Sequence, residues 1–465
     1  MIAATINYGR LNEEEKQMKL DGNARVRLYR EGNAFWESGC IRQYMIGGVD
    51  EYSGWADESM SWKTDCYVGD WSSCLDDLYL SGPDAERFLQ YLCTNTFQNF
   101  QVGKAKHYVM CAESGKVMAE GILMKLGEDE YLLQSNTNYA LYKYYTNAEA
   151  YPNLTVRQPE YFYLEAYGFA IAADRFKFQV SGPKALALCE KLTGQDLKSV
   201  RFMNFVPVQI KGVDCIALRQ GMAGEIGFEF QGPIQHRAEL FSYIFQEGRE
   251  FGCRRLGERT AMINHLEANF ATYCVHYVAP IDKDYDEYQK AAGYEPYYAA
   301  IAGSFDGEWD ELAHSPYEMG WDSCVKFDHD FIGRAALEKE NESRKRKIVT
   351  LEFNDEDMIR LYASLFQKEQ EPYELIDLPM RSYCHVQADT IYDKDGKYIG
   401  IATTPGYSIY FRKVLALSFV DHEIPVGTEV DVLWGTPDKP QTKVRAIVKP
   451  APYKQDNRKV DLKTV

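Results

Sequence analysis

The sequence predicts a multidomain α+β protein that ends in a separate, smaller β domain. Three observations carry this prediction: the chain length, a repeated strand–turn–helix unit in the first two-thirds, and a change to strand patterns near residue 348. At 465 residues the chain is too long for one ordinary hydrophobic core, so two or three domains are expected. Hydrophobic residues make up 45% and charged residues 26%, a balance typical of a folded globular chain.

The repeated unit is marked by a Ser-Gly-Pro turn. Residues 81–85 (Ser-Gly-Pro-Asp-Ala) recur at residues 181–185 as Ser-Gly-Pro-Lys-Ala. Each copy follows a strand-like run and precedes apolar residues at helical spacing. Proline fits the first turn of a helix because its missing N–H would have no partner there. Two related strand–turn–helix units are therefore expected.

Shorter signals divide the rest of the first 345 residues. Polar turns at 113–116 and 127–130 predict two hairpins. Apolar spacing over about 234–250 predicts a helix that ends before Gly252. Residues 282–312 are polar, acidic and rich in tyrosine, which predicts a long irregular segment, either a binding loop or lid or a plain surface excursion.

The sequence after about residue 348 predicts mostly β-strands. The charged residues 339–347 predict the end of a helix and a linker. Asp-Lys-Asp-Gly at 393–396 is a hairpin signal, and 414–419 and 429–434 have strand composition. We expect residues 348–455 to form a β-barrel or sandwich.

Composition excludes several function classes. With 69 acidic and 52 basic residues the net charge is -17, which argues against non-specific binding of nucleic acid or anionic membranes. No run approaches the ~18 apolar residues of a membrane span, and the first residues lack a signal or transit pattern, so the cytoplasm is expected. No motif for ATP, NAD or a serine nucleophile is present.

Cysteine and histidine spacing predicts no metal site. The 11 cysteines include no pair separated by two residues, so reduced buried thiols are expected. The triplet at 328–330 (Asp-His-Asp) is interpreted as a turn. Aromatic residues reach 14%, which indicates either aromatic-rich cores and sheets or a pocket for a flat ring.

Several motifs, in order along the chain, resemble the folate-dependent one-carbon transferases typified by the glycine-cleavage T-protein. They are the two Ser-Gly-Pro-x-Ala turns, 224–229 (Gly-Glu-Ile-Gly-Phe-Glu), 257–260 (Gly-Glu-Arg-Thr) with 266–268, 331–334 (Phe-Ile-Gly-Arg) and 406–408 (Gly-Tyr-Ser). The resemblance implies a three-domain cloverleaf around a central folate channel. It places two interleaved α+β lobes in residues 1–345, a C-terminal β-barrel or sandwich in 346–465, and tetrahydrofolate as the cofactor.

Other stretches resemble the tetrahydrofolate-dependent aryl O-demethylases that act on vanillate and syringate. These are 325–334, 362–366 and 421–429. This resemblance implies methyl transfer from an aryl ether to N5 of the reduced folate. Because a phenolate leaves poorly, such an enzyme must hold N5 in line with the carbon and protonate or stabilise the departing oxygen.

The resemblance also implies cofactor-binding residues. Glu229 matches the pterin-binding acid of the family, and it alternates with Phe228 and Phe230, so it should point away from them. The remaining matched positions are Glu225, Gln179, Phe270, Arg259 and Tyr407.

The sequence departs from the aryl demethylases at four substrate positions. Asn136 stands where they have the arginine that binds the substrate carboxylate, Trp71 where they have Gln, Cys74 where they have an active-site His, and Ala261 where they have a catalytic Tyr. Without that arginine a carboxylate would be uncompensated in a closed site, so we infer a neutral aromatic ether as substrate, such as a guaiacol-type compound or a methylenedioxy lignan. A methylenedioxy donor would yield methylene-folate instead of methyl-folate.

The proton donor must then lie elsewhere, and the candidates are Tyr44, Cys74, Asp70 and His265. Two alternatives stay open. A non-catalytic folate-binding protein is one, although the Lys-Gly-Cys motif of such relatives is missing here. A demethylase of an amine or sulfonium donor is the other, because Trp71 could face a cation.

Overall fold

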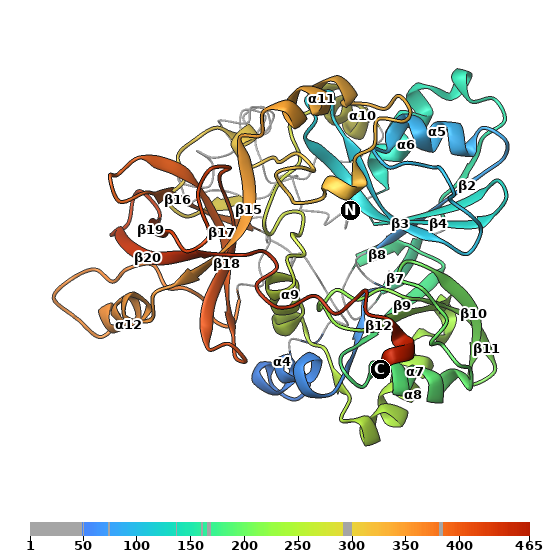
Figure 1. The fold of residues 1–465 in the computed structure, drawn as a ribbon, viewed down its shortest axis with the longest axis horizontal. Coiled ribbons are helices and arrows are strands. Elements are labelled where there is room, and N and C mark those ends of the chain that lie inside the picture. The colour runs from blue at the N-terminus through green and yellow to red at the C-terminus, as the bar shows by residue number, and fades with distance from the viewer. Residues whose placement is uncertain are drawn as a thin grey trace.

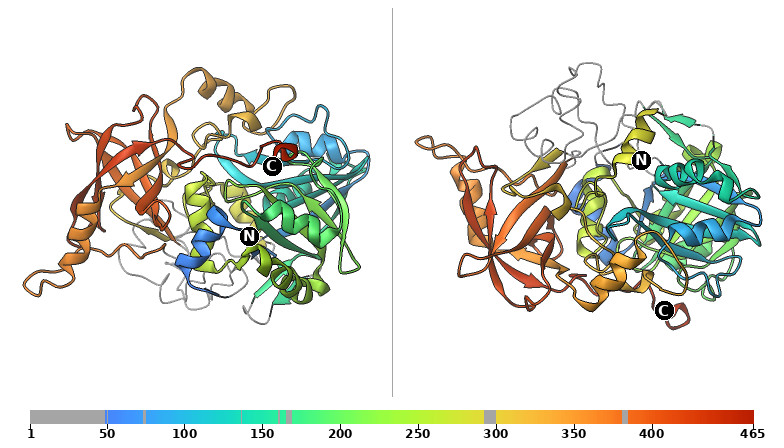
Figure 2. Two further views of the ribbon diagram at one scale, coloured as in Figure 1. Left: turned by 60° about the horizontal axis from the view of Figure 1, so that its bottom comes forward. Right: turned by 90° about the horizontal axis from the view of Figure 1, so that it is seen from above.

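The computed structural model describes residues 49, 51–72, 75–135, 137–159, 161–164, 169–291, 300–380 and 385–465. Two lobes built on mainly antiparallel sheets lie on one side of the molecule and a β-barrel lies on the other (Figure 1). Helix α9 (Glu258–Glu267) lies between them, and two further views keep this arrangement (Figure 2).

The first lobe is a five-stranded antiparallel sheet in the order β3-β4-β5-β2-β6. Its strands are β2 (Asp76–Ser81), β3 (Ala105–Cys111), β4 (Val117–Gly127), β5 (Glu130–Ser135) and β6 (Thr155–Arg157). Its helices are α5 (Ala85–Leu92), α6 (Asn138–Thr146) and the short η2 (Ala148–Ala150). The pairs β3–β4 and β4–β5 confirm the two predicted hairpins.

The second lobe has a six-stranded sheet in the order β10-β11-β12-β9-β1-β13. Its strands are β1 (Tyr67–Asp70), β9 (Arg175–Ser181), β10 (Phe205–Ile210), β11 (Val213–Leu218), β12 (Gly227–Pro233) and β13 (Arg254–Arg255). Its helices are α4 (Trp55–Thr64), α7 (Ala185–Thr193), η3 (Ile234–His236), α8 (Arg237–Gly248) and η4 (Arg249–Phe251). A short ladder of β7 (Tyr161–Leu164) and β8 (Phe169–Ala172) lies between the lobes in sequence.

The two lobes exchange chain segments. Strand β1 precedes the whole first lobe in sequence, yet it pairs with β9 and β13 of the second lobe. The predicted repeat is confirmed, because β2–α5 and β9–α7 have the same strand–turn–helix form. In both turns the glycine is required: Gly82 and Gly182 have φ of 106° and 135°, and an added Cβ would lie 2.1 Å from Asn153 O and 2.6 Å from Asp65 O, respectively.

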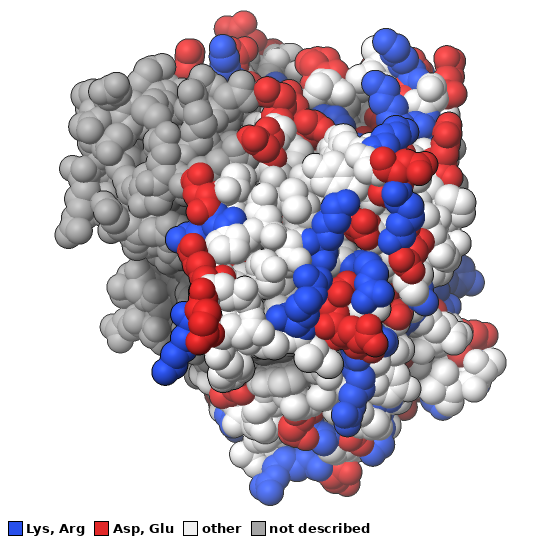
Figure 3. Space-filling model, turned by 90° about the vertical axis from the view of Figure 1, so that its left-hand side faces the viewer, with Lys and Arg blue, Asp and Glu red and all other residues white. Residues whose placement is uncertain are grey.

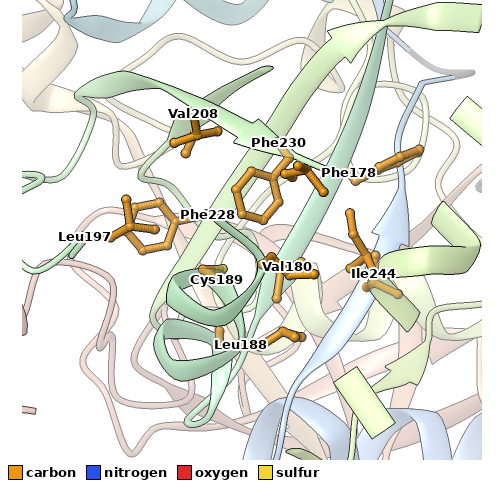
Figure 4. Packing of buried hydrophobic residues seen from close by; sticks show 14 of the residues in the cluster. Phe178, Val180, Leu188, Cys189, Leu197, Val208, Phe228, Phe230 and Ile244 are labelled. Carbon is orange, nitrogen blue, oxygen red and sulfur yellow. The ribbon is translucent and has the colours of Figure 1, made fainter. Parts of the chain in front are cut away.

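The core of the second lobe explains the alternation seen around Glu229. Phe228 and Phe230 of β12 pack with Phe178 and Val180 of β9 beneath α7 and α8 (Figure 4). Since neighbouring residues of a strand face opposite sides, Glu229 lies on the other face of this sheet. The predicted helix near 234–250 is confirmed as η3, α8 and η4, and Gly252 follows in the left-handed region.

The prediction of a long irregular segment over 282–312 was wrong where the described residues form regular elements. Helix α10 (Lys283–Ala291) begins the segment, and β14 (Ala300–Ala302) and η5 (Trp309–Glu311) follow. The helix forms because Tyr285 and Tyr288 lie three residues apart and pack against Tyr142 of α6, with ring centroids 5.3 and 5.1 Å away. The tyrosines at 294, 297 and 298 lie outside the described residues.

The C-terminal strands form a closed six-stranded barrel, which resolves the barrel-or-sandwich alternative. Pairing of β16 with β19 closes the order β16-β17-β18-β15-β20-β19, and β14 adds a parallel strand to β16. The strands are β15 (Arg346–Phe353), β16 (His385–Tyr392), β17 (Tyr398–Ser408), β18 (Lys413–Asp421), β19 (Glu429–Trp434) and β20 (Thr442–Lys449). Helix α12 (Asp355–Ser364) packs on the barrel. The helices η6 (Asp322–Cys324) and α11 (Arg334–Glu342) precede the barrel in sequence, and η7 (Leu462–Thr464) follows it.

After the barrel the chain returns to the second lobe. Leu462 is buried in the core of that lobe, and the guanidinium of Arg219 donates to the carbonyl oxygens of Arg458 and Val460.

On the barrel side of the molecule, acidic and basic side chains lie next to one another (Figure 3). Among the described residues, no helix combines the length and apolar character of a membrane crossing.

Glu267 at the end of α9 joins the elements that meet at the centre. Its carboxylate lies 2.7 Å from Lys63 Nζ, and it accepts hydrogen bonds from Trp62 Nε1 at 3.0 Å and Ser408 Oγ at 2.6 Å. Thus two of the family-like motifs, 266–268 and 406–408, contact each other directly.

Replacing Glu267 with alanine is expected to lower the free energy of unfolding by ~3–5 kcal/mol, because the Lys63 side chain, only 5% exposed, would lose its counter-charge. Urea unfolding followed by fluorescence measures the change. The matched control is Glu429→Ala, which removes an exposed partner of Lys394 and should cost about 1 kcal/mol or less. Equal losses in the two variants would contradict this assignment.

Candidate functional site

A cavity of about 660 Å³ lies where the two lobes, the loop after α9 and the start of the barrel meet. The first lobe contributes Lys106, His107 and Ile122, and the second contributes Met203 and Gln220. Ala268–Phe270 follow α9, and Lys347 and Ile348 belong to β15. A cavity at such a junction, with polar groups on its wall, is the usual form of a small-molecule site.

Gln179 and Glu229 form a polar pair beside this cavity. They are cross-strand neighbours on β9 and β12 and are 0% and 1% exposed. Glu229 accepts hydrogen bonds from Gln220 Nε2 at 2.8 Å and Gln231 Nε2 at 2.6 Å, and Gln220 also lines the cavity. Burial raises the pKa of Glu229, although the two glutamine donors and the charge of Lys177 oppose that shift.

Only the amide oxygen of Gln179, and not its amide nitrogen, is hydrogen-bonded to described residues. Its Oε1 accepts from Tyr67 Oη at 2.5 Å and from Met222 N at 3.2 Å. Its Nε2 has no hydrogen-bond partner among the described residues, and the same is true of Trp71 Nε1 and Asn264 Oδ1. Buried donors and acceptors without a partner are costly, so they indicate where a polar ligand would bind.

An aromatic stack lies beside the polar pair. The ring of Trp71 is stacked on His265 at 5.2 Å with an interplanar angle of 9°, and Phe270 lies 4.9 Å from the same imidazole. His265 Nδ1 is 3.1 Å from Thr272 Oγ1, and its Nε2 is 3.1 Å from Met222 Sδ. Burial lowers the pKa of His265 to about 3, with His276 adding to the shift, so the ring is neutral near pH 7. Ala261 packs in the same buried cluster as Trp71.

A buried hydrogen-bond network links the pair to the first lobe. Gln231 Nε2 also donates to Gln134 Oε1 at 2.7 Å, and Gln134 Nε2 donates to Asp77 Oδ1 at 2.8 Å. Lys177 Nζ lies 3.1 Å from Asp77 Oδ1, and both side chains are 0% exposed. The network therefore runs from β2 and β5 of one lobe to β9 and β12 of the other.

Asp70 lies apart from this site. Its Oδ2 is 2.6 Å from the guanidinium of Arg237 at the start of α8, and its Oδ1 accepts from Ser72 N at 3.0 Å. Asp70 pairs with Phe178 in register, whereas Gly69 pairs with Gln179, so Asp70 is on the helix-covered face of the sheet.

Three further predicted residues bind protein groups. Glu225 is paired with the ammonium of Lys454, and Asn457 Nδ2 donates to it at 2.9 Å. The guanidinium of Arg259 is 2.7 Å from Glu51 Oε1 and 2.7 Å from the carbonyl oxygen of Leu378. Tyr407 contacts Trp55 edge to face at 6.0 Å. Tyr44, Cys74 and Asn136 lie outside the described residues.

Sequence reasoning missed the polar partners of Glu229, although a signal was present. On β9 and β12 the residues Lys177, Gln179, Glu229 and Gln231 alternate with phenylalanines, which marks one face as buried and polar. The described part of the chain contains no group of three or more His, Cys, Asp or Glu side chains that could hold a metal.

The residues present fit a reduced folate. A pterin carries ring N–H and amino donors together with a carbonyl acceptor. Glu229 supplies carboxylate acceptors, and Gln179 supplies an amide donor without a protein partner. The adjoining cavity has room for the remainder of such a molecule.

Comparisons with known proteins agree with this geometry. The family model described as "GCVT N-terminal domain" matches residues 28–285. A syringate O-demethylase of Sphingobium sp. is 33% identical over 87% of this chain and 89% of the relative. A sesamin methylene transferase of Sinomonas sp. is 30% identical over 89% of this chain and 92% of the relative.

The fold has a match among solved structures. The glycine cleavage system aminomethyltransferase T of Bartonella henselae superposes with a TM-score of 0.61 at 18% identity, over 88% of this chain and 92% of that one. The predicted α+β fold of the T-protein type, with a C-terminal barrel, is thereby confirmed. The family match, the two long relatives and the shared fold together show that this chain belongs to the GCVT family.

Proposed function

We propose that this protein is a tetrahydrofolate-dependent transferase that takes a one-carbon unit from a neutral aromatic ether. The observation that carries the proposal is the buried Gln179–Glu229 pair next to the Trp71–His265 stack. Two relatives, a syringate O-demethylase and a sesamin methylene transferase, are named for aromatic ether donors, which supports it.

Bound tetrahydrofolate would supply N5, the nucleophile that accepts the one-carbon unit. Glu229 and Gln179 would hold the pterin through hydrogen bonds, and so fix where N5 lies. Such positioning can remove much of the entropic cost of bringing two reacting molecules together. The Trp71–His265 stack would face the donor ring and exclude water from it, and Phe270, beside the same imidazole, would contact the folate.

The proposed donor is neutral. The sequence places Asn136 where aryl demethylases have a carboxylate-binding arginine. A benzoate carboxylate would therefore be costly to desolvate here.

Of the four proton-donor candidates, we propose Tyr44 or Cys74. Asp70 is held as the partner of Arg237, and His265 with a pKa of about 3 carries no dissociable imidazolium proton near pH 7. Loss of the donor is typically worth ~10²–10⁴-fold in rate. Tyr44→Phe and Cys74→Ala, compared for kcat on the same substrate, separate the two.

The test is turnover, with tetrahydrofolate in excess, of a panel of neutral guaiacyl, veratryl and methylenedioxy compounds, the carboxylates vanillate and syringate, and amine and sulfonium methyl donors. Mass spectrometry of the folate product separates methyl from methylene transfer. We expect turnover of a neutral member, with vanillate and syringate much poorer. Folate binding without turnover of any donor would overturn the proposal and favour a non-catalytic folate-binding protein. Turnover of only amine or sulfonium donors would favour that alternative.

Replacing Trp71 is expected to act on the donor and not on the folate. Trp71→Leu removes the ring and should raise the donor KM by ~5–10-fold, since an aromatic pair is worth about 0.5–1.5 kcal/mol. Trp71→Phe keeps a ring and is the matched control, with a change of ~3-fold or less. Folate affinity, measured by titration calorimetry, should be unchanged in both. Equal donor KM values in all three proteins would contradict this role.

A further inference from the structure

Cys324, His107 and Glu120 form a hydrogen-bonded chain on the wall of the central cavity. Cys324 Sγ lies 3.7 Å from His107 Nδ1, and His107 Nε2 lies 2.8 Å from Glu120 Oε2. Cys324 and His107 both line the cavity that Gln220 and Phe270 also line. A thiol, an imidazole and a carboxylate in this order are the parts of an activated cysteine nucleophile.

The surrounding residues hold this chain in place. The backbone oxygen of His107 accepts from Asn95 Nδ2 at 2.8 Å, and the backbone oxygen of Cys324 accepts from Thr94 Oγ1 at 3.0 Å. Trp321 packs edge to face on the imidazole at 4.7 Å. The thiol and the imidazole come from positions 217 residues apart, so their contact is a product of the fold.

Cys324 differs from the other described cysteines. It is partly exposed, whereas Cys66, Cys93, Cys111, Cys189, Cys215, Cys253 and Cys274 are buried. Burial opposes ionisation of the Cys324 thiol, but the hydrogen bond and charge of His107 outweigh it and hold its pKa below the usual range. Burial likewise opposes the charge on His107, yet its bonds to Cys324 and Glu120 raise its pKa to about 10. For Cys111, on the same strand as His107, burial raises the pKa.

We propose that Cys324 is a thiol-modification site that takes a small disulfide into the cavity, and that the adduct blocks folate binding. The Cys324 thiolate attacks one sulfur of the disulfide, a new S–S bond forms, and the old S–S bond breaks. The displaced thiolate leaves with the proton of the His107 imidazolium. Cys324 is thereby oxidised and one half of the disulfide is reduced, so no other oxidant is required. The blocking step rests on the proposed folate function, and the thiol chemistry does not.

The first experiment tests the chemistry alone. The full chain is treated with 5,5′-dithiobis(2-nitrobenzoate) at several pH values, and the labelled cysteine is identified by peptide mass spectrometry. We expect one fast reaction at Cys324 that persists below neutral pH. His107→Gln should slow it ~10-fold or more at acid pH, and Glu120→Gln should have a smaller effect. Cys111→Ser is the matched control and should leave the fast reaction unchanged.

His107 is the titratable group that contacts the thiol, and Glu120 lies on the far side of its imidazole. The nearby Asp322 is paired with Arg344, and Lys106, Lys347 and His422 line the same cavity. An Asp322→Asn variant should therefore change the pH profile less than His107→Gln does. Fast labelling at another cysteine with Cys324 unmodified would overturn the proposal. So would a His107→Gln profile identical to that of the unmodified sequence.

The second experiment tests the link to folate. A stable 5-substituted tetrahydrofolate should slow labelling of Cys324 at least ~10-fold at saturation, and protein carrying glutathione on Cys324 should lose folate affinity until a thiol reductant restores it. Labelling that folate does not slow would overturn the blocking step while the thiol site stands. If the unmodified protein binds no folate in calorimetry, the proposed function fails instead, which is a separate result.

Discussion

Glu229→Gln is expected to weaken folate binding by ~10–150-fold and to lower kcat/KM by at least as much. A hydrogen bond to a charged group is worth about 1.5–3 kcal/mol, and the substitution removes the charge from a residue that is 1% exposed. The new amide would also direct an N–H toward either Gln220 or Gln231, whose Nε2 atoms now donate to the carboxylate. The amides would then reorient, and the acceptor offered to the ligand would be lost.

Glu225→Gln is the matched comparison, because it alters the other acid of the same family-like motif. Its carboxylate faces Lys454 and Asn457 of the C-terminal segment, so the substitution should reduce stability with little change in folate affinity. Titration calorimetry gives the affinities and urea unfolding gives the stabilities. If Glu225→Gln loses folate and Glu229→Gln keeps it, the two roles assigned here are reversed.

The raised pKa of Glu229 should make the folate affinity of this site depend on pH. Because burial raises the pKa, a smaller share of this side chain is ionised near neutral pH than in an exposed glutamate. If the carboxylate is the form that accepts from the pterin, folate affinity should increase with pH through the titration of Glu229. In Glu229→Gln that increase should vanish, and measuring affinity across pH in both proteins checks this.

Local signals in the sequence predicted the local parts of the fold. The Ser-Gly-Pro turns, the hairpins and the helix near 234–250 depend on residues close together in the chain, and all were confirmed. The transfer of β1 into the second sheet was not predictable in this way, because the pairing of Tyr67 with Ser181 spans more than a hundred residues. Helix α10 was missed because its polar composition hid the spacing of Tyr285 and Tyr288.

The candidate site shows the same limit. Alternation around Glu229 placed it on the face opposite the core, and the register with Gln179 then follows from sheet pairing. Asp70 is next to Trp71 in sequence, but its side chain points to the helix-covered face of β1, where it pairs with Arg237. The contact between Cys324 and His107 had no sequence signal, because neither residue lies in a recognisable motif and the fold alone brings them together.

Lys177→Met is expected to lower the free energy of unfolding by ~3–5 kcal/mol, because it leaves Asp77 as an uncompensated buried acid. Burial already raises the pKa of Asp77, and the charge of Lys177 opposes that shift. Without the ammonium the folded-state pKa should rise further. A carboxyl whose folded pKa is raised contributes stability at low pH that is lost as pH rises, so the loss in Lys177→Met should be larger at about pH 8 than at about pH 5.

A double-mutant cycle separates this buried pair from its surroundings. Lys177→Met combined with Asp77→Asn removes both charges. The asparagine oxygen can still accept the hydrogen bond from Gln134 Nε2, so the double variant should recover much of the lost stability. The matched surface variant, Lys211→Met opposite Glu239, should change stability little and show little pH dependence. The urea midpoint of the first unfolding transition is the readout, since the chain has several lobes.

Because the network continues from Asp77 through Gln134 and Gln231 to Glu229, the single variant should also weaken folate binding, and the double variant should restore part of it. A stability loss without any change in folate affinity would show that the network joins the lobes but does not position Glu229.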